Sequence, residues 1–473
     1  MRRSMTRQTG TACDGYLPGA AIPRGQVVAP SLLSGSGVGI KRQAGDLRLD
    51  FLCAFAFLNP LVVQLGFFLA PPTERGALSV PQLFQGCVFV VAVVAVLLSR
   101  WRPTIHTARI GRFLVLIATA AAVILFKTAF DHGQLITVSE MRGDLIFFFK
   151  IFFWAFMWWL VAIVVRRKHD ARRLLHAVLA GAFLTSLIVL VSYVTGAGNV
   201  AAYEQSGVMA SVGASGVSPK QTVAYLAPCA LIAMYLGRGR RPVAALMIAL
   251  PLVGSTLLTY DRSIQVGMVV ASGWLALWWA VLSGRRVSRN WSIGLLLAAC
   301  VTAVLLFSYV GVDSLIARWT ADFQSGRPGS GRLEFYQAAS ERYCDGTVSD
   351  LLVGIGYTGI KETMRSRCGM AIHTHSDFFD LLLGGGLLGV CLYGALYWIL
   401  WRYWRSVPRG SAESAVMGAS LAIYAVMSLI TGQLEATHAM FCLGASLHCC
   451  HLMYPRKPVL KNRPAGRTAR QIW

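Results

Sequence analysis

The chain has 473 residues, of which 55% are hydrophobic and only 14% are charged, and its mean hydropathy is +0.57. Soluble domains carry about 25% charged residues, so this composition excludes an ordinary soluble protein. A net charge of +23 would suggest nucleic-acid binding in a soluble chain. Here the arginines cluster in short stretches between apolar runs, as the positive-inside rule requires of a membrane protein.

Residues 1–47 are rich in Gly, Pro, Ser and Arg and show no apolar periodicity, which predicts a disordered basic tail or an over-extended translation start. They lack the apolar core of a signal peptide. Beyond them, apolar runs near 20 residues recur, each long enough to cross a hydrocarbon core of roughly 30 Å. We expect twelve spans, at residues 51–70, 80–99, 113–130, 145–165, 174–195, 221–237, 242–259, 264–283, 291–310, 377–401, 412–432 and 437–454.

The short connections between these runs differ in their content of lysine and arginine. One alternating set holds 18 basic residues and the other holds four, so we expect the first set, and both termini, to be cytoplasmic. The first set comprises 100–112, 166–173, 238–241, 285–289 and 402–409. The second set comprises 71–79, 131–144, 196–220 and 260–263.

The fold expected from these patterns is an all-α polytopic membrane protein of about twelve transmembrane helices, with one large extracytoplasmic loop between helices 9 and 10. Its parts are a disordered basic cytoplasmic tail (1–47), helices 1–9 (48–310), the loop (311–376), helices 10–12 (377–455) and a second basic cytoplasmic tail (456–473).

The 311–376 loop is the one long hydrophilic segment between spans, and loops of this length are usually functional. Short helices are expected around "SLIARW" and "GRLEFYQAASERY", and a turn at "LLVGIGYTG" would separate them from the histidines that follow. Cys344 and Cys368 both lie in this loop, where an oxidising compartment would allow a disulfide between them. Sequence fixes neither their distance nor their geometry, so free thiols remain the alternative.

Two arginines are candidates for binding an anion at the outer face. Arg262 lies in the hairpin "TYDRS", and a lone arginine at membrane depth tends to face a cavity and bind a ligand. Its alternatives are snorkelling to the headgroups or pairing with Asp261. Arg332, in "SGRPGSGRLEFYQAA", is expected at a helix N-terminus, where free backbone N–H groups also favour an anion. The alternative for Arg332 is a solvated charge paired with Glu334.

The stretch "HTHSDFFDLLLGGGLLG" at 373–389 places two histidines at the outer mouth of the tenth span. A histidine is the natural general base at neutral pH, and Asp377 is a candidate to orient it. The alternatives are an interfacial histidine bonded to the loop or an adventitious metal site, and no third ligand has recognisable spacing. Glycines 384–386 predict close helix packing.

The order "TYDRS", "GSGRLEFYQAA", "LLVGIGYTG" and "HSDFFDLLLGGGLLG" resembles the bacterial O-antigen ligase and O-antigen polymerase family, over roughly residues 200–400. That family typically has Ser-Arg at an outer hairpin, Arg near the start of a loop helix, a Gly-x-Gly turn and a His-Asn element before an apolar helix. Counting back from "GLLG", the family histidine falls on His375 and not on His373. Ser376 stands where the family has asparagine, and Asp261 precedes the hairpin arginine where serine is common.

The resemblance implies a glycosyltransferase whose donor is a glycan on undecaprenyl pyrophosphate, at the outer face of the bacterial inner membrane. Arg262 and Arg332 would then bind the pyrophosphate, and His375 would take the proton of the acceptor hydroxyl. Direct displacement would invert the anomeric centre. No D-x-D pattern occurs in the outer loops, so a metal-independent reaction without a cofactor is expected. Accessory roles are assigned to His373, Asp377, Lys220 and Glu435, the last because it resembles an acidic position of the family.

Two acceptors and one other class of protein remain open. A polymerase uses a second lipid-linked repeat unit and a ligase uses lipid A-core, and "HSDFFD" favours an O-antigen, capsule or exopolysaccharide polymerase. Expected partners are the lipid-linked donor, the acceptor, the bilayer and a chain-length regulator, but no nucleic acid. The alternative class is a twelve-helix secondary transporter, with Lys127 and Lys150 as its intramembrane charges. The chain lacks the half-to-half similarity typical of such transporters.

Overall fold

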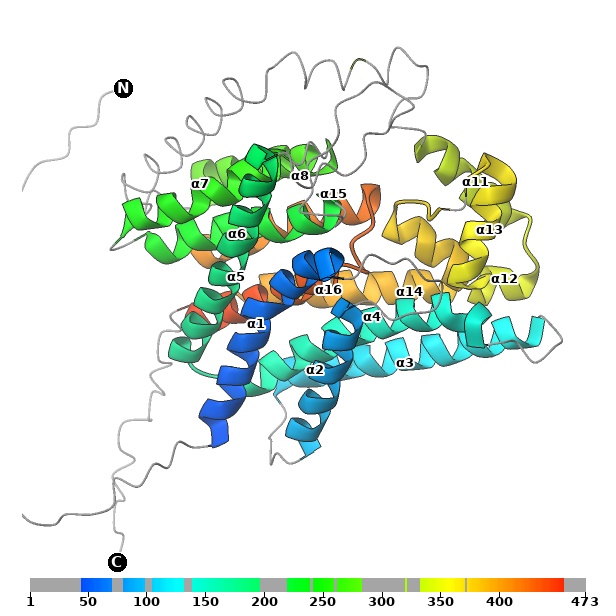
Figure 1. Cartoon of the computed structure of the whole chain (residues 1–473), viewed down its shortest axis with the longest axis horizontal. Helices are drawn as coiled ribbons and strands as arrows, with labels where there is room; N and C mark the ends of the chain where they lie inside the picture. Colours follow the sequence, from blue (N-terminus) through cyan, green and yellow to red (C-terminus); the bar gives the residue numbers. More distant parts are fainter. Residues whose placement is uncertain are drawn as a thin grey trace, which may run out of the picture. The chain divides into compact units, whose positions relative to one another are not determined.

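The computed structural model describes residues 44–69, 80–97, 104–131, 138–195, 219–238, 241–258, 262–282, 320, 332–370 and 372–454. Every regular element within these ranges is a helix (Figure 1). The predicted span at 291–310, the predicted helix at "SLIARW", the C-terminal tail and all but the end of the N-terminal tail lie outside the described residues.

The apolar runs account for most of the helices. Eleven of the twelve predicted spans coincide with a described helix, within a few residues at most ends. The helices are α1 (Ala44–Leu69), α2 (Val80–Leu97), α3 (Ile105–Asp131), α4 (Val138–Val164), α5 (Lys168–Thr195), α6 (Pro219–Gly237), α7 (Pro242–Leu258), α8 (Arg262–Leu277), α14 (Asp377–Arg405), α15 (Ala412–Ile430) and α16 (Thr437–Met453). A π-helical turn, η1 (Trp278–Leu282), continues α8.

By length and composition, six of the described helices could cross a membrane: α2, α3, α4, α5, α14 and α15. Helices α6, α7 and α8 are apolar but shorter. The expectation of an all-α protein is therefore confirmed for the described residues, which include helices long and apolar enough to span a membrane. The total of twelve spans stays a prediction.

Contacts at the helix ends show the relative directions of α2, α4, α6, α15 and α16. Arg238, just after α6, lies 3.0 Å from the Glu413 carboxylate at the start of α15. His448, near the end of α16, lies 2.9 Å from the carbonyl oxygen of Val165, just after α4. At the other end of the bundle Gln85, near the start of α2, donates to Thr437 at the start of α16. Helices α4, α6 and α16 thus end where α15 begins, as alternating crossings require; which end faces the cytoplasm stays a prediction from charge.

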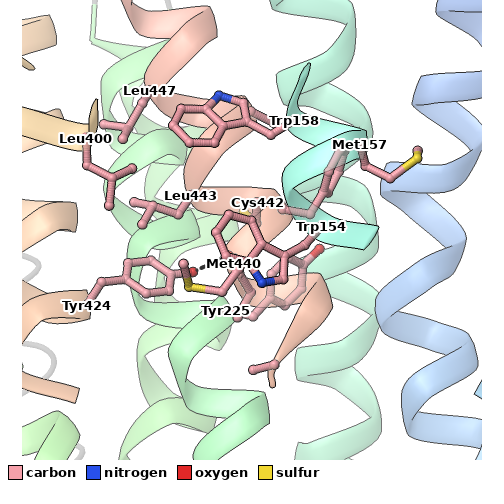
Figure 2. Close-up of a cluster of buried hydrophobic side chains, with 14 of the residues drawn as sticks. Trp154, Met157, Trp158, Tyr225, Leu400, Tyr424, Met440, Cys442, Leu443 and Leu447 are labelled. Carbon is pink, nitrogen blue, oxygen red and sulfur yellow. Dashed lines mark hydrogen bonds between the residues drawn. The ribbon is translucent and has the colours of Figure 1, made fainter. Parts of the chain in front are cut away.

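The core surrounds α16, whose residues are buried from Thr437 to His451 (Figure 2). A helix that is apolar on all sides is buried on all sides, and α4, α5, α6, α14 and α15 contact it. Two of the large side chains around it satisfy their polar ends: Trp154 donates to Leu434 O at 3.1 Å and Tyr424 donates to Ala439 O at 2.6 Å. The indole nitrogen of the buried Trp158 has no hydrogen-bond partner among the described residues. Buried polar groups without such partners would cost stability.

Three shorter helices precede α14: α11 (Arg332–Cys344), α12 (Val348–Val353) and α13 (Gly356–Cys368). Helix α11 confirms the helix predicted at "GRLEFYQAASERY", and the predicted turn is present at Gly354 and Ile355. Helix α13, between that turn and the histidines, was not expected. Glycines near its start made a helix difficult to recognise in the sequence. The apolar residues Tyr357, Ile360 and Met364 nevertheless recur at helical spacing, and all three are buried.

Helix α14 was predicted as one continuous span but is kinked at Gly386, which has φ 57° and ψ −149°. The kink separates a half-helix at 377–385 from a longer segment at 387–405. It leaves the Leu383 carbonyl oxygen to accept a hydrogen bond from Ile355 N at 3.0 Å. A Cβ atom on Gly354 would overlap the Gly384 backbone. The glycine run therefore serves close packing, as predicted, but against the α12–α13 turn.

Candidate functional site

The segment 373–376 is held to the half-helix by one carboxylate. Asp380, one turn into α14, accepts hydrogen bonds from Thr374 N at 2.9 Å and Thr374 Oγ1 at 2.7 Å. The same threonine hydroxyl contacts the backbone nitrogen and oxygen of Ser376 at 3.2 Å. Thr374 is fully buried and Asp380 is 7% exposed. The residue between these anchors is His375.

His375 adopts φ 62°, in the left-handed region, and among the described residues it is the one non-glycine residue with positive φ. That conformation costs an L-residue roughly 1–2 kcal/mol, and such strain persists only where surrounding contacts impose it. The bonds to Asp380 on either side of His375 in the chain provide those contacts. Its side chain is half-buried, with the ring centroid 6.2 Å from that of Phe335.

Asp377 binds a different segment from the one expected. Its carboxylate accepts hydrogen bonds from Ser428 Oγ, Gln433 N and Leu434 N, at distances between 2.7 and 3.1 Å. It is 6% exposed. All the hydrogen bonds that the structure gives Asp377 therefore fix the α15–α16 connection to the start of α14, and the expected contact that would orient a histidine is not made.

The first turn of α11 lies against this corner. Arg332 is the first residue of α11, as predicted, and Phe335, on the same helix face, approaches His375. Tyr336 stacks on Phe379 of α14 with centroids 4.6 Å apart and donates to Leu429 O at 3.3 Å. Burial raises the pKa of Tyr336, and the Arg332 guanidinium opposes that shift. The fold thus brings Arg332 and His375 to the same corner.

The charge of Arg332 is not neutralised by any described side chain. Ion pairs in the described part of the chain join other arginines and lysines to carboxylates, and Arg332 is in none of them. The predicted alternative, a pair with Glu334, is therefore not formed. A half-buried guanidinium at a helix N-terminus, with the positive end of the helix dipole beside it, is suited to bind an anion.

His373 packs against α13, whereas His375 approaches α11. The His373 ring stacks on Tyr357 of α13 with centroids 4.0 Å apart, and Tyr357 stacks on Phe147 of α4 at 3.9 Å. Helix α13 is anchored beside this stack by Asp144 of α4, whose Oδ1 accepts a hydrogen bond from Thr358 N at 2.9 Å. This arrangement gives His373 a packing role between α4 and α13.

The side chains of Arg262 and Lys220 lie outside the described residues, but their helices can be followed. Helix α8 runs antiparallel to α15: Gly267 lies beside Ile423, and Trp274 Nε1 donates to Ala415 O at 3.1 Å. If the same register continues to the first residue of α8, Arg262 lies opposite Ser428 of α15. Ser428 is the residue whose hydroxyl donates to Asp377. The backbone of Arg262 therefore begins at the end of the bundle that holds Arg332 and His375.

Lys220 is the second residue of α6 and lies at the same end of the bundle. Five residues further along this helix, Tyr225 lies 5.7 Å from His438, close to the start of α16, measured between ring centroids. Glu435, just before α16, forms a 2.6 Å ion pair with Lys150 of α4. Lys127 of α3 pairs with Asp350 of α12 at 2.8 Å. Both lysines that could serve a transporter are thus paired with a carboxylate, one in α12 and the other in the α15–α16 connection.

Cys344 and Cys368 are free thiols in the structure, so the disulfide considered from the sequence is not formed there. Cys344 is exposed at the end of α11 and Cys368 is half-buried at the end of α13. Within the ranges that the structure describes, no three His, Cys, Asp or Glu side chains converge closely enough to hold a metal ion.

Comparisons with protein-family models and with curated protein sequences found no match to this chain. The candidate site therefore stands on its own geometry. Sequence reasoning selected Arg332 and His375, which the fold brings together, but missed Thr374, Asp380 and Asp144. A signal for Asp380 was present, because an acidic residue one turn into an apolar helix is well placed to cap the preceding loop.

Proposed function

We propose that this protein is a multi-pass glycosyltransferase of the bacterial inner membrane. It polymerises oligosaccharide repeat units linked to undecaprenyl pyrophosphate into O-antigen, capsule or exopolysaccharide, at the periplasmic face. The observation that carries the proposal is that the strained His375 approaches Phe335, one turn along the helix that begins with Arg332, an arginine that no described carboxylate neutralises. An anion-binding group and a general base within one corner are the minimum that transfer from a lipid pyrophosphate needs.

The reaction follows from the chemistry of the donor. The acceptor hydroxyl oxygen attacks the anomeric carbon, a new C–O bond forms, and the bond from that carbon to the pyrophosphate oxygen breaks. The hydroxyl proton passes to the His375 imidazole, and undecaprenyl pyrophosphate leaves with the electron pair. Direct displacement inverts the anomeric centre. Arg332, joined by Arg262 from the start of α8, stabilises the charge that develops on the leaving group.

Two alternative functions are an O-antigen ligase and a secondary transporter. An O-antigen ligase would transfer the same donor glycan to lipid A-core, and this site is equally suited to that reaction. A secondary transporter would need charged groups that are free to bind and release its substrate. The ion pairs of Lys150 with Glu435 and of Lys127 with Asp350 favour the transferase over the transporter.

The test is complementation of a host strain that lacks this gene, with surface glycan resolved by chain length and protein abundance measured in the membrane. H375A and R332A should abolish long glycan at normal abundance, since loss of a general base alone slows such steps about 10²–10⁴-fold. R332K should retain part of the activity, because lysine keeps the charge but not bidentate binding. Single repeats left on the acceptor would indicate a polymerase, and unattached lipid-linked polymer a ligase.

H373A and R365A are the matched controls. His373 is the second histidine of the motif, and Arg365 is an exposed arginine on the neighbouring α13. Both variants should still make long glycan once corrected for abundance. Unchanged glycan in H375A at normal abundance would contradict the proposal and favour transport.

A further inference from the structure

We infer that Asp380 and Thr374 are positioning residues, which together fix the backbone of His375 in the conformation the transfer requires. This inference rests on the proposed transferase function. It concerns two residues that neither the sequence motifs nor the resemblance selected.

Hydrogen bonds to Asp380 hold the residues on both sides of His375. Asp380 Oδ1 accepts from both Thr374 N and Thr374 Oγ1, and Asp380 N donates to Ser376 O at 2.8 Å. One residue therefore holds the chain on both sides of His375. Both partners are almost completely buried, so the loss of either bond would leave an unsatisfied buried polar group.

The backbone of His375 is strained. A histidine at φ 62° would relax to the β or right-handed α region if nothing held it. Relaxation about one backbone angle would swing the imidazole away from the Phe335 ring and from the first turn of α11. A displacement of about 1 Å in a catalytic group can cost about 10²-fold in rate. The Asp380–Thr374 bonds supply the restraint.

The neighbouring acid, Asp377, has a different role from Asp380. Asp377 is equally close to His375 in the chain, yet its carboxylate binds Ser428 and the backbone of the α15–α16 connection. Asp377 therefore joins two membrane helices, whereas Asp380 acts on the loop that carries the histidine. Asp380 and Thr374 act on His375 through the backbone on either side of it.

The experiment compares transfer rates of purified variants, with lipid-linked repeat units extracted from the deletion strain as donor. T374V, which loses the hydroxyl and keeps the shape, should lower kcat about tenfold or more with little change in KM, because donor binding lies with the arginines. T374S restores the hydroxyl and should stay near the wild-type rate. D380A should fall further than D380N, because asparagine still offers one acceptor oxygen to Thr374.

S376A is the matched control, because the Ser376 hydroxyl is buried in the same loop and has no hydrogen-bond partner among the described residues. It should match the wild type. Wild-type kcat in both T374V and D380A, with H375A inactive, would overturn the inference and leave the transferase intact. Equal loss in D380N and D380A, with T374V unaffected, would overturn it in favour of a charge role. If the wild type itself transfers nothing to any acceptor, the proposed function fails.

Discussion

A Cβ atom on Gly386 would lie 2.7 Å from the backbone nitrogen of Gly354. The kink of α14 and the α12–α13 turn therefore meet backbone to backbone, and both glycines have positive φ, 57° and 81°. Since the half-helix at 377–385 follows directly from His375, this contact sets where the histidine lies relative to α11–α13.

Replacing Gly354 or Gly386 with alanine should destabilise the protein by about 3 kcal/mol or more. Overpacking against backbone costs roughly 1–3 kcal/mol, and positive φ adds roughly 1–2 kcal/mol for any residue with a Cβ atom. The measurement is thermal unfolding in detergent, together with abundance in the membrane.

Gly369 provides the control for that prediction. It also has positive φ, 72°, but a Cβ atom there would meet nothing within 4 Å. G369A should lose about 1 kcal/mol from strain alone. Equal losses in G354A and G369A would show that the backbone contact contributes nothing.

The ion pair of Lys150 with Glu435 ties α4 to the α15–α16 connection, and we expect it to be structural. Its two side chains are 22% and 33% exposed, so removing one partner leaves a partly buried charge unpaired. K150M and E435Q should each lower stability, and the double variant should recover about 1 kcal/mol of the summed loss. A double-mutant cycle of unfolding free energies measures this coupling, and strict additivity would contradict it.

The ion pair of Asp350 with Lys127 joins α12 to α3, and we expect its contribution to stability to be lost at low pH. Burial alone would raise the pKa of Asp350, but the hydrogen bond from Lys127, the bond from Thr347 N and the nearby Arg342 charge outweigh burial and lower it. A carboxylate with a lowered folded pKa contributes its full stability above its unfolded pKa, about 3.9, and loses that contribution as the pH falls through the folded pKa.

The measurement is the Tm of the wild type minus that of D350N, followed from about pH 6 to pH 3. We expect a constant positive difference above about pH 5 and a shrinking difference below about pH 4. A difference that does not change with pH would show that the ionised form of Asp350 is not preferentially bound.

Labelling of Cys344 and Cys368 should show on which side of the membrane the 311–376 loop lies and whether these two thiols are oxidised. Cys344 is exposed, whereas burial and the nearby Glu334 raise the pKa of the half-buried Cys368. Because the thiolate is the reactive form, Cys344 should react faster with a membrane-impermeant maleimide added to cells with a permeabilised outer membrane. R409C in a cysteine-free background, in a connection predicted to be cytoplasmic, should react only after lysis.

Labelling of Cys344 only after reduction would show that the disulfide forms in the cell. Labelling only after lysis would reverse the predicted orientation of the chain.

Hydropathy was sufficient to locate the helices, because the free energy of placing an apolar run in a bilayer depends on local composition and length. Eleven of the twelve spans expected from hydropathy coincide with described helices. The glycine- and proline-rich stretch before Arg332 was enough to predict that a helix begins at this residue, as α11 does. The family resemblance, and not hydropathy, selected His375, and the structure places the ring of this histidine 6.2 Å from that of Phe335 in α11, centroid to centroid.

Tertiary structure alone decided which side chains act together. Asp377 bonds to residues more than 50 positions away, and Lys150 pairs with a residue 285 positions away. Such contacts depend on how helices pack, which no local pattern encodes. The kink at Gly386 likewise depends on a backbone contact with Gly354. The start of α13 depends on the hydrogen bond from Thr358 N to the Asp144 carboxylate in α4. The sequence by itself therefore determined where the chain forms helices and which residues could carry chemistry. The packing decided that Asp380, and not Asp377, holds the loop of His375, because only the folded chain brings a particular carboxylate within reach of a particular amide.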